Sequence, residues 1–311
     1  MKIVFMGTPD YSLPTLQALI DSEHEVLAVY TKPDMPRGRG KVLEFTPIKS
    51  LALEHQIPVY QPKNFKSEEA VKEFTDLGAD IAVVIAYGLI LPQAVLSAYP
   101  MGCVNLHASL LPKFRGASPI QAAVLAGESV TGVTSMQMDA GLDTGDMLLK
   151  AEIPLSCDET AGSLHDKLSQ VSAELCLKTL RALAEKTVKA IKQEEEKATY
   201  AGKITKDMGE IRWSNSAIEI DRQIRAMTPW PSAYTHFKGK MLKIWNAVPM
   251  ADLNRKAEIG QIIHVSDSGI EVACGKGSLL VKELQIEGKK RMYVTDFLNG
   301  YHLKSGDYLN R

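Results

Sequence analysis

The chain contains 311 residues with a formal net charge of −1, and 45% of its residues are hydrophobic and 23% charged. This length allows two domains with buried cores, and the composition excludes a disordered or collagen-like chain. The opening MKIVFMGTPDY has too few apolar residues for a signal-peptide core, and no later apolar run reaches the length of a membrane span. We therefore expect a cytoplasmic protein with no membrane partner.

Strands and helices alternate through the first half of the chain. Apolar strand patterns and helical patterns take turns in the ranges 2–6, 13–20, 26–30, 48–55, 58–60, 67–77, 81–87, 102–106, 119–126, 131–138 and 160–186. This alternation predicts an α/β fold with a doubly wound, parallel, Rossmann-like sheet. The first strand-to-helix turn, GTPD, has one glycine where a dinucleotide site needs three, which argues against NAD or FAD binding.

The second half has a different pattern of predicted secondary structure. After a polar stretch at 187–206 and a helix near 216–227, short strands follow one another with KG, SDSG and GKG turns. This pattern predicts a small OB-like β-barrel. We therefore expect a catalytic domain at 1–189, a linker at 190–206 and a C-terminal OB-like domain at 207–311.

Charge is distributed unevenly between the two halves. Residues 1–205 carry 20 basic and 25 acidic residues, whereas residues 206–311 carry 16 basic and 12 acidic ones. An ordinary solvated surface explains so small a difference, but a basic domain appended to a catalytic one also suits a polyanion-binding role.

Two polar residues stand at the end of the predicted strand 102–106. Asn105 and His107 are two positions apart, so on a strand they point the same way, at the edge where open α/β sheets bind ligands. Acyl transfer to an amine needs a donor for the oxyanion and a group that moves a proton, and an amide beside an imidazole supplies both. Taken alone, an Asn-x-His pair on a strand is more often structural.

A second motif, MDAGLDTGD, covers residues 138–146. Its glycines indicate a tight loop, and Asp143 within it can orient His107 and stabilise the charged imidazole. Asp-rich turns are usually only turns, so this signal is also ambiguous by itself.

The cysteines give no sign of a metal site. Cys103, Cys157, Cys176 and Cys274 are far apart in the sequence, whereas zinc ligands usually come two to four residues apart. We expect all four to be small buried side chains without a metal or a disulfide.

The two motifs together resemble folate-dependent formyltransferases. The resemblance lies in NLHASLLPKFRGASPIQAA and GVTSMQMDAGLDTGDMLL, and it extends to FMGTPDYS, TKPDMPRGRGK, VVIAYGLILP, TPWPSAY and KIWNA. The outlying segments are similar to the branch of the family that acts on initiator tRNA. The resemblance implies 10-formyltetrahydrofolate as co-substrate and initiator Met-tRNA as acceptor, with no permanently bound cofactor and no metal.

The resemblance also assigns residues. It implies a catalytic trio of Asn105, His107 and Asp143, and a tetrahydrofolate contact along Ser109, Leu110, Leu111 and Pro112. A long, proline-stiffened basic loop at 31–47 is costly unless it binds something, although a solvated basic loop explains it equally well. The resemblance implies that this loop contacts tRNA, through Arg39 and Lys41. Lys203 and Lys206 in the linker are further tRNA candidates.

Two other activities fit the same trio. One is a formyltransferase for a small amine, such as an amino sugar or a purine precursor, which has no use for a basic C-terminal domain. The other is a hydrolase that sends the formyl group to water. A non-catalytic RNA-binding protein would leave both motifs unexplained. No self-association stripe is evident, so we expect a monomer.

Overall fold

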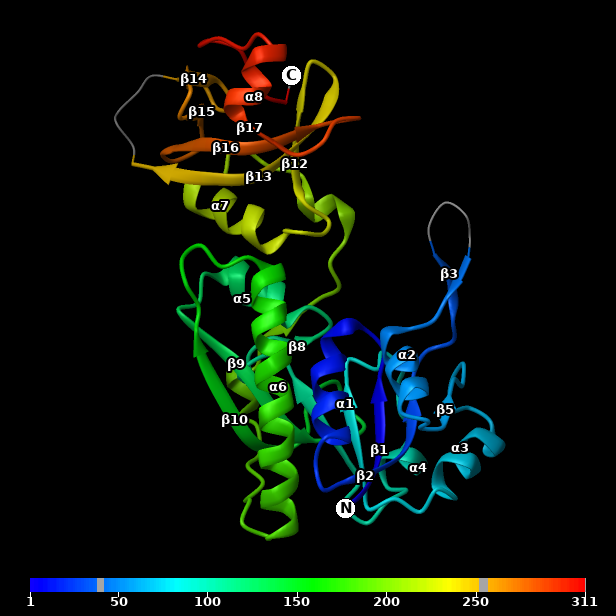
Figure 1. Cartoon of the computed structure of the whole chain (residues 1–311). Helices are drawn as coiled ribbons and strands as arrows, with labels where there is room; N and C mark the ends of the chain where they lie inside the picture. Colours follow the sequence, from blue (N-terminus) through cyan, green and yellow to red (C-terminus); the bar gives the residue numbers. More distant parts are fainter. Residues whose placement is uncertain (38–41, 252–256, 311) are drawn as a thin grey trace. The chain divides into compact units, whose positions relative to one another are not determined.

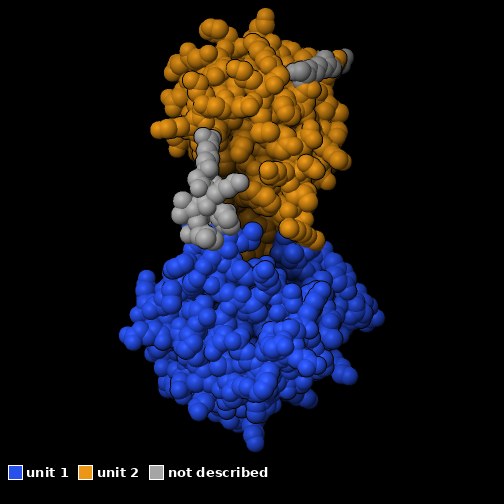
Figure 2. Space-filling view, turned by 90° about the vertical axis from the view of Figure 1, so that its right-hand side faces the viewer, with its two compact units in different colours: residues 1–119, 130–154, 165–201 blue, residues 120–129, 155–164, 202–311 orange. Residues whose placement is uncertain are grey.

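The computed structural model describes residues 1–37, 42–251 and 257–310 (Figure 1). The chain forms two compact units, coloured separately in Figure 2. The first unit contains residues 1–119, 130–154 and 165–201, and the second contains 120–129, 155–164 and 202–311. Arg39 and Lys41 of the predicted tRNA loop lie outside the described residues.

A seven-stranded sheet forms the centre of the first unit. Its order is β10-β9-β7-β6-β1-β2-β5. The strands are β1 (Lys2–Gly7), β2 (Glu25–Tyr30), β5 (Val59–Tyr60), β6 (Ile81–Ile85), β7 (Cys103–His107), β9 (Val130–Gln137) and β10 (Met147–Pro154).

The sheet is mixed, which corrects the prediction of a parallel one. The strands from β5 to β7 run parallel, but β9 is antiparallel to both β7 and β10. The connection between β9 and β10 covers only residues 138–146, too few for a crossover helix, so these two strands pair as a hairpin. Strand β10 was not predicted from the sequence.

Helices cover the sheet and supply its core. They are the 3₁₀ turn η1 (Asp10–Ser12), α1 (Leu13–Ile20), α2 (Pro47–Glu54), α3 (Glu68–Thr75), α4 (Gln93–Leu96) and α6 (Ala161–Ala184), most of which were predicted to within a few residues. On one face of the sheet, Val4 and Val84 pack in a buried cluster with Phe74 of α3 and Val95 of α4. Alternate positions along each strand thus pack against a helical layer.

The predicted basic loop at 31–47 contains a short hairpin. Strands β3 (Met35–Arg37) and β4 (Val42–Glu44) pair antiparallel, although the prolines had suggested a loop. Lys49 of α2 forms an ion pair with Asp34 at the base of the hairpin, and this contact lowers the pKa of that carboxyl. The hairpin is therefore tied to the first unit.

A second small pairing joins distant parts of the first unit. Strand β8 (Arg115–Gly116) runs parallel to β11 (Tyr200–Ala201), which follows the 3₁₀ turn η2 (Glu195–Lys197). Ile191 pairs with Met147 at the start of the same stretch. Residues 191–201, called the strap below, therefore run along the first unit.

The second unit holds a separate antiparallel sheet. Its order is β12-β13-β16-β15-β14, with β17 added to β16. The elements are α5 (Pro119–Ala126), η3 (Lys206–Gly209), α7 (Ala217–Ala226), β12 (Ala233–Phe237), β13 (Lys240–Met250), β14 (Ile262–Ser266), β15 (Gly269–Ala273), β16 (Ser278–Ile286), β17 (Met292–Tyr293) and α8 (Val294–Gly300). Among the described residues no pairing joins β12 to β14, so a closed OB-like barrel is not confirmed.

The cysteines depart from expectation at one position. Cys103, Cys176 and Cys274 are buried and free, but Cys157 is exposed because it lies in the turn before α6. Burial raises the pKa of the Cys103 thiol to about 12, which keeps it protonated and unreactive. No group of three or more His, Cys, Asp or Glu residues that could hold a metal ion occurs in the described ranges. Across those same ranges, none of the helices has the length and apolar character needed to span a bilayer.

Candidate active site

Asn105 and His107 lie at the carboxyl end of β7. Every position of this strand, which lies between β6 and β9, is buried. Asn105 is 9% exposed and His107 6% exposed. Two polar side chains so deeply placed at a strand end are held for a contact rather than for solvation.

Both ring nitrogens of His107 face acceptors. Nε2 lies 2.9 Å from the carbonyl oxygen of Phe114 and donates to it, since a carbonyl can only accept. Nδ1 lies 3.6 Å from Oδ2 of Asp143. The Asp143 carboxylate thus lies next to Nδ1, slightly beyond hydrogen-bonding distance, while Nε2 is engaged by the backbone.

Asp143 is fixed by the backbone of β8. Its Oδ2 accepts a hydrogen bond of 2.7 Å from the Gly116 amide, and its own backbone is left-handed, with φ of +54°. The structure thus brings Asp143 beside His107, as predicted from the sequence. The catalytic roles of these residues and of Asn105 stay predictions.

The Asn105 side chain differs from its polar neighbours. Within the described residues, no hydrogen bond engages its amide, whereas the buried Thr134 and Ser135 on β9 are both bonded. Neither atom of this amide is among the fully buried polar atoms that lack a partner, so both keep some contact with solvent that a ligand can replace. Asn105 therefore has a donor and an acceptor available for a bound molecule.

The predicted folate segment at 109–112 divides into buried and accessible parts. Ser109 and Leu111 are fully buried, and the Ser109 hydroxyl donates to the Lys113 carbonyl at 2.6 Å. Leu110 and Pro112 are partly exposed. The buried pair supports the segment, which leaves Leu110, Pro112 and the backbone as the parts that a ligand can reach.

Lys150 of β10 contacts the backbone of the predicted folate segment 109–112. Its Nζ donates to the Leu111 carbonyl at 2.6 Å, and burial lowers the pKa of its ammonium group. The bond holds the peptide that leads into Pro112.

A buried arginine that was not predicted from the sequence lies next to the site. The Arg115 side chain has no solvent exposure, and its Nη1 pairs with the 72% exposed Glu195 at 2.9 Å. Its Nε donates to Oε1 of Gln193 at 3.0 Å. Burial opposes the charge, but the hydrogen bonds that Arg115 donates to Glu195 and Tyr200 outweigh it and raise the pKa of the guanidinium. Glu195 lies within the predicted linker 190–206, so the sequence held no clear signal of this contact.

The predicted tRNA residues that the structure describes lie in the second unit. Lys203 and Lys206 are both exposed, and Lys206 begins η3. Their ammonium groups are accessible to a polyanion.

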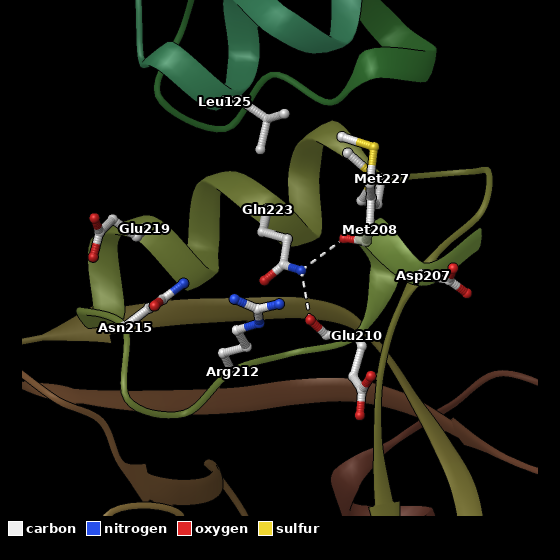
Figure 3. Close-up of a pocket in the computed structure, with 9 residues that line it drawn as sticks. All are labelled: Leu125, Asp207, Met208, Glu210, Arg212, Asn215, Glu219, Gln223 and Met227. Carbon is white, nitrogen blue, oxygen red and sulfur yellow. Dashed lines mark hydrogen bonds between the residues drawn. The ribbon is translucent and has the colours of Figure 1, made fainter. Parts of the chain in front are cut away.

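The second unit also contains a hollow of about 510 Å³, none of whose residues had been predicted as functional (Figure 3). α7 and the segment 207–215 form most of its lining. Gln223 of α7 projects toward that segment, and its amide donates to the carbonyls of Met208 and Glu210 at 2.8 and 2.9 Å. Glu210, Arg212 and Glu219 around it are exposed, so the hollow is a shallow, solvated surface.

Two family models match the chain. One, described as formyl transferase, matches residues 1–180, and the other, described as formyl transferase, C-terminal domain, matches residues 203–302. The first contains Asn105, His107 and Asp143. The chain therefore belongs to the formyl transferase family.

Close relatives narrow this assignment. A methionyl-tRNA formyltransferase of Agathobacter rectalis is 46% identical over 308 residues, which make up 99% of each chain. One of Legionella pneumophila is 52% identical over 299 residues, or 96% of this chain and 95% of that protein. Within its family, the chain belongs with the methionyl-tRNA formyltransferases.

The fold is shared more widely. The N-formyltransferase of Helicobacter canadensis, solved with folinic acid and dTDP-3-aminofucose, matches with a TM-score of 0.68 and 18% identity. That match covers 90% of this chain and 98% of the other. At this identity the likeness concerns the fold alone.

Proposed function

We propose that the chain transfers the formyl group of 10-formyltetrahydrofolate to the α-amino group of methionine on initiator Met-tRNA. One observation carries the proposal: in a chain of this family, His107 lies beside Asp143 and two residues from an Asn105 amide that has no partner among the described residues. An available amide, an imidazole and a carboxylate are the groups that amine formylation uses.

In the proposed reaction the deprotonated methionyl amine attacks the formyl carbon. The electron pair of the formyl C=O bond moves to oxygen, where the Asn105 amide donates a hydrogen bond to it and the positive charge of protonated His107 stabilises it. The oxyanion then re-forms the C=O bond and the bond from carbon to the folate nitrogen breaks. A proton leaves the attacking nitrogen and reaches the departing one through His107 or a water beside it. The amine is already a nucleophile, so no covalent enzyme intermediate is needed.

Asp143 orients His107 and favours its charged form in this scheme. The carboxylate is held by the Gly116 amide, so it is already in place when charge develops. The folate ring lies along Leu110, Pro112 and the adjoining backbone. No step requires a metal ion.

The second unit supplies tRNA contacts in this proposal. Its net positive charge and the exposed Lys203 and Lys206 support phosphate binding. Arg39 and Lys41 are proposed to contact the same tRNA. The proposal includes an OB-like arrangement of the C-terminal sheet, a monomeric state and a cytoplasmic location.

A filter assay with formyl-labelled 10-formyltetrahydrofolate tests the proposal. Label should appear on methionylated initiator tRNA, while free methionine and an amino sugar should remain unlabelled. Transfer to the small amines but not to Met-tRNA would replace the proposed acceptor. Formate release at full rate without any amine would make the protein a hydrolase.

A further inference from the structure

The strap contacts both the loop that carries Asp143 and the segment whose carbonyl faces His107. Its Gln193 amide nitrogen donates to the carbonyls of Asp143 and Gly145, at 2.7 and 2.8 Å. The same side chain accepts from Nε of Arg115 at 3.0 Å. Gln193 therefore joins the loop that carries Asp143 to the strand that follows Phe114.

The strap also fixes the peptide that accepts from His107. The Arg115 amide donates to the Thr199 carbonyl at 2.8 Å, and the Phe114 amide donates to the Thr199 hydroxyl at 2.8 Å. Since the Phe114 carbonyl belongs to the same peptide as the Arg115 amide, these bonds set the direction in which that carbonyl faces His107.

Strand β8 thus supplies a partner to each member of the pair. The Phe114 carbonyl immediately before it accepts from His107, and the Gly116 amide within it donates to Asp143. Among the strands that the structure describes, only β11 of the strap pairs with β8. The separation between imidazole and carboxylate therefore depends on where the strap holds β8 and the Asp143 loop.

We propose that Gln193 is a positioning residue for formyl transfer, which acts by holding the Asp143 backbone at the distance that His107 requires. Misplacement of a reacting group by about 1 Å can reduce a rate on the order of a hundredfold. The inference rests on the proposed function, because formyl transfer is the activity in which it is measured.

The first test replaces Gln193 by a side chain that cannot donate. Gln193→Leu should lower kcat for Met-tRNA formylation about ten- to hundredfold. KM for both substrates should change less than about twofold, because the Gln193 amide is already engaged by Arg115, Asp143 and Gly145 and is not proposed to bind either substrate. Circular dichroism and the melting temperature report whether the variant is folded.

An isosteric variant separates the two contacts of Gln193. Gln193→Glu keeps an acceptor for Arg115 but directs a carboxylate oxygen at the two loop carbonyls, so kcat should fall as far as in Gln193→Leu. Recovery of normal kcat in Gln193→Glu would overturn the proposal, since it would show that only the Arg115 contact matters. This variant keeps the shape of the side chain and so also serves if Gln193→Leu does not fold.

A double-mutant cycle tests whether Gln193 acts through Asp143. In an Asp143→Asn background, measured by single turnover, Gln193→Leu should reduce the rate less than about threefold. An undiminished effect in that background would indicate a merely structural role and would reject the inference.

Gln223→Leu is the matched control, because it removes an equivalent pair of hydrogen bonds, from a side-chain amide to two backbone carbonyls, in the second unit. Its kcat should stay within about twofold of the parent value. A loss as large as that of Gln193→Leu would also reject the inference. The parent protein tells the two proposals apart: no formylation of Met-tRNA by the parent defeats the proposed function, whereas an active parent with an unimpaired Gln193→Leu variant defeats only the positioning role.

Discussion

Gln193 in the first unit and Gln223 in the second make the same contact. Each half-buried side-chain amide donates to two backbone carbonyls two residues apart. The carbonyls differ in what their segment carries. Those of Asp143 and Gly145 belong to a loop whose carboxylate faces His107, whereas those of Met208 and Glu210 belong to a segment with exposed side chains (Figure 3).

This difference shows that the chemistry of a contact does not reveal its role. Around His107 the polar groups are buried and face one another, and the Asn105 amide remains available. Around Gln223 the charged side chains are solvated. Burial of mutually oriented polar groups, and not the depth of a hollow, distinguishes the candidate active site.

The largest expected effect is a loss of formylation activity on substitution around His107, compared with substitution in the hollow of the second unit. Asn105→Ala and His107→Ala should each lower kcat for formylation on the order of a hundredfold or more, because each removes a group that stabilises the oxyanion. Asn215→Ala in the hollow of the second unit should leave kcat within about twofold. Steady-state kinetics of the three folded variants decide the matter, and near-normal turnover of both active-site variants would refute the proposed mechanism.

The next effect concerns the strand that supports the site. Gly116 has φ of +112°, and a Cβ there would lie 2.7 Å from the Ala201 carbonyl. Gly116→Ala should therefore lower the free energy of unfolding by about 2–3 kcal/mol and separate β8 from β11. Urea denaturation measures the loss. An unchanged midpoint would mean that the strap tolerates a wider spacing than the structure shows.

Gln223→Leu should have a moderate effect on stability alone. It leaves two carbonyls without their donor, at a cost of about 1–2 kcal/mol, reduced where water replaces the amide. Thermal unfolding at neutral pH measures this cost. The comparison between the two glutamines would fail if Gln223→Leu were as stable as the parent protein.

The smallest effect is a pH dependence in the second unit. Hydrogen bonds from the Ser216 hydroxyl and amide lower the pKa of Glu219. A lowered folded-state pKa stabilises the fold above the ordinary glutamate value of about 4.3, and this stabilisation disappears as the pH falls through the folded-state value. Glu219→Gln should therefore melt at most about 2 °C lower at pH 7, with no difference in strong acid. A difference that persists in acid would show that the charge is not its cause.

Local patterns predicted much of the first unit. The buried run at β6, the amphipathic pattern of α3 and the Asn-x-His pair on β7 are each visible within a few residues of sequence. The family resemblance joined these residues to Asp143, which lies close to His107.

Local patterns could not predict which distant strands pair. Whether β9 runs parallel or antiparallel depends on the strands beside it, and β8 consists of two residues whose partner strand is 85 positions away. Arg115 and Gln193 are polar residues in stretches that read as surface, and only the folded chain reveals that Arg115 is buried. The alternation of strand and helix patterns predicts the layers of the fold, but it does not predict which loops contact one another.

Strand β11 and the rest of the strap come after the proposed catalytic residues in the chain, so they are synthesised later. All three proposed catalytic residues leave the ribosome before Gln193 and Tyr200, which complete the support of β8. A nascent or truncated chain that ends at residue 189 holds the whole trio and lacks the strap. Such a chain is expected to be catalytically idle until the strap is added.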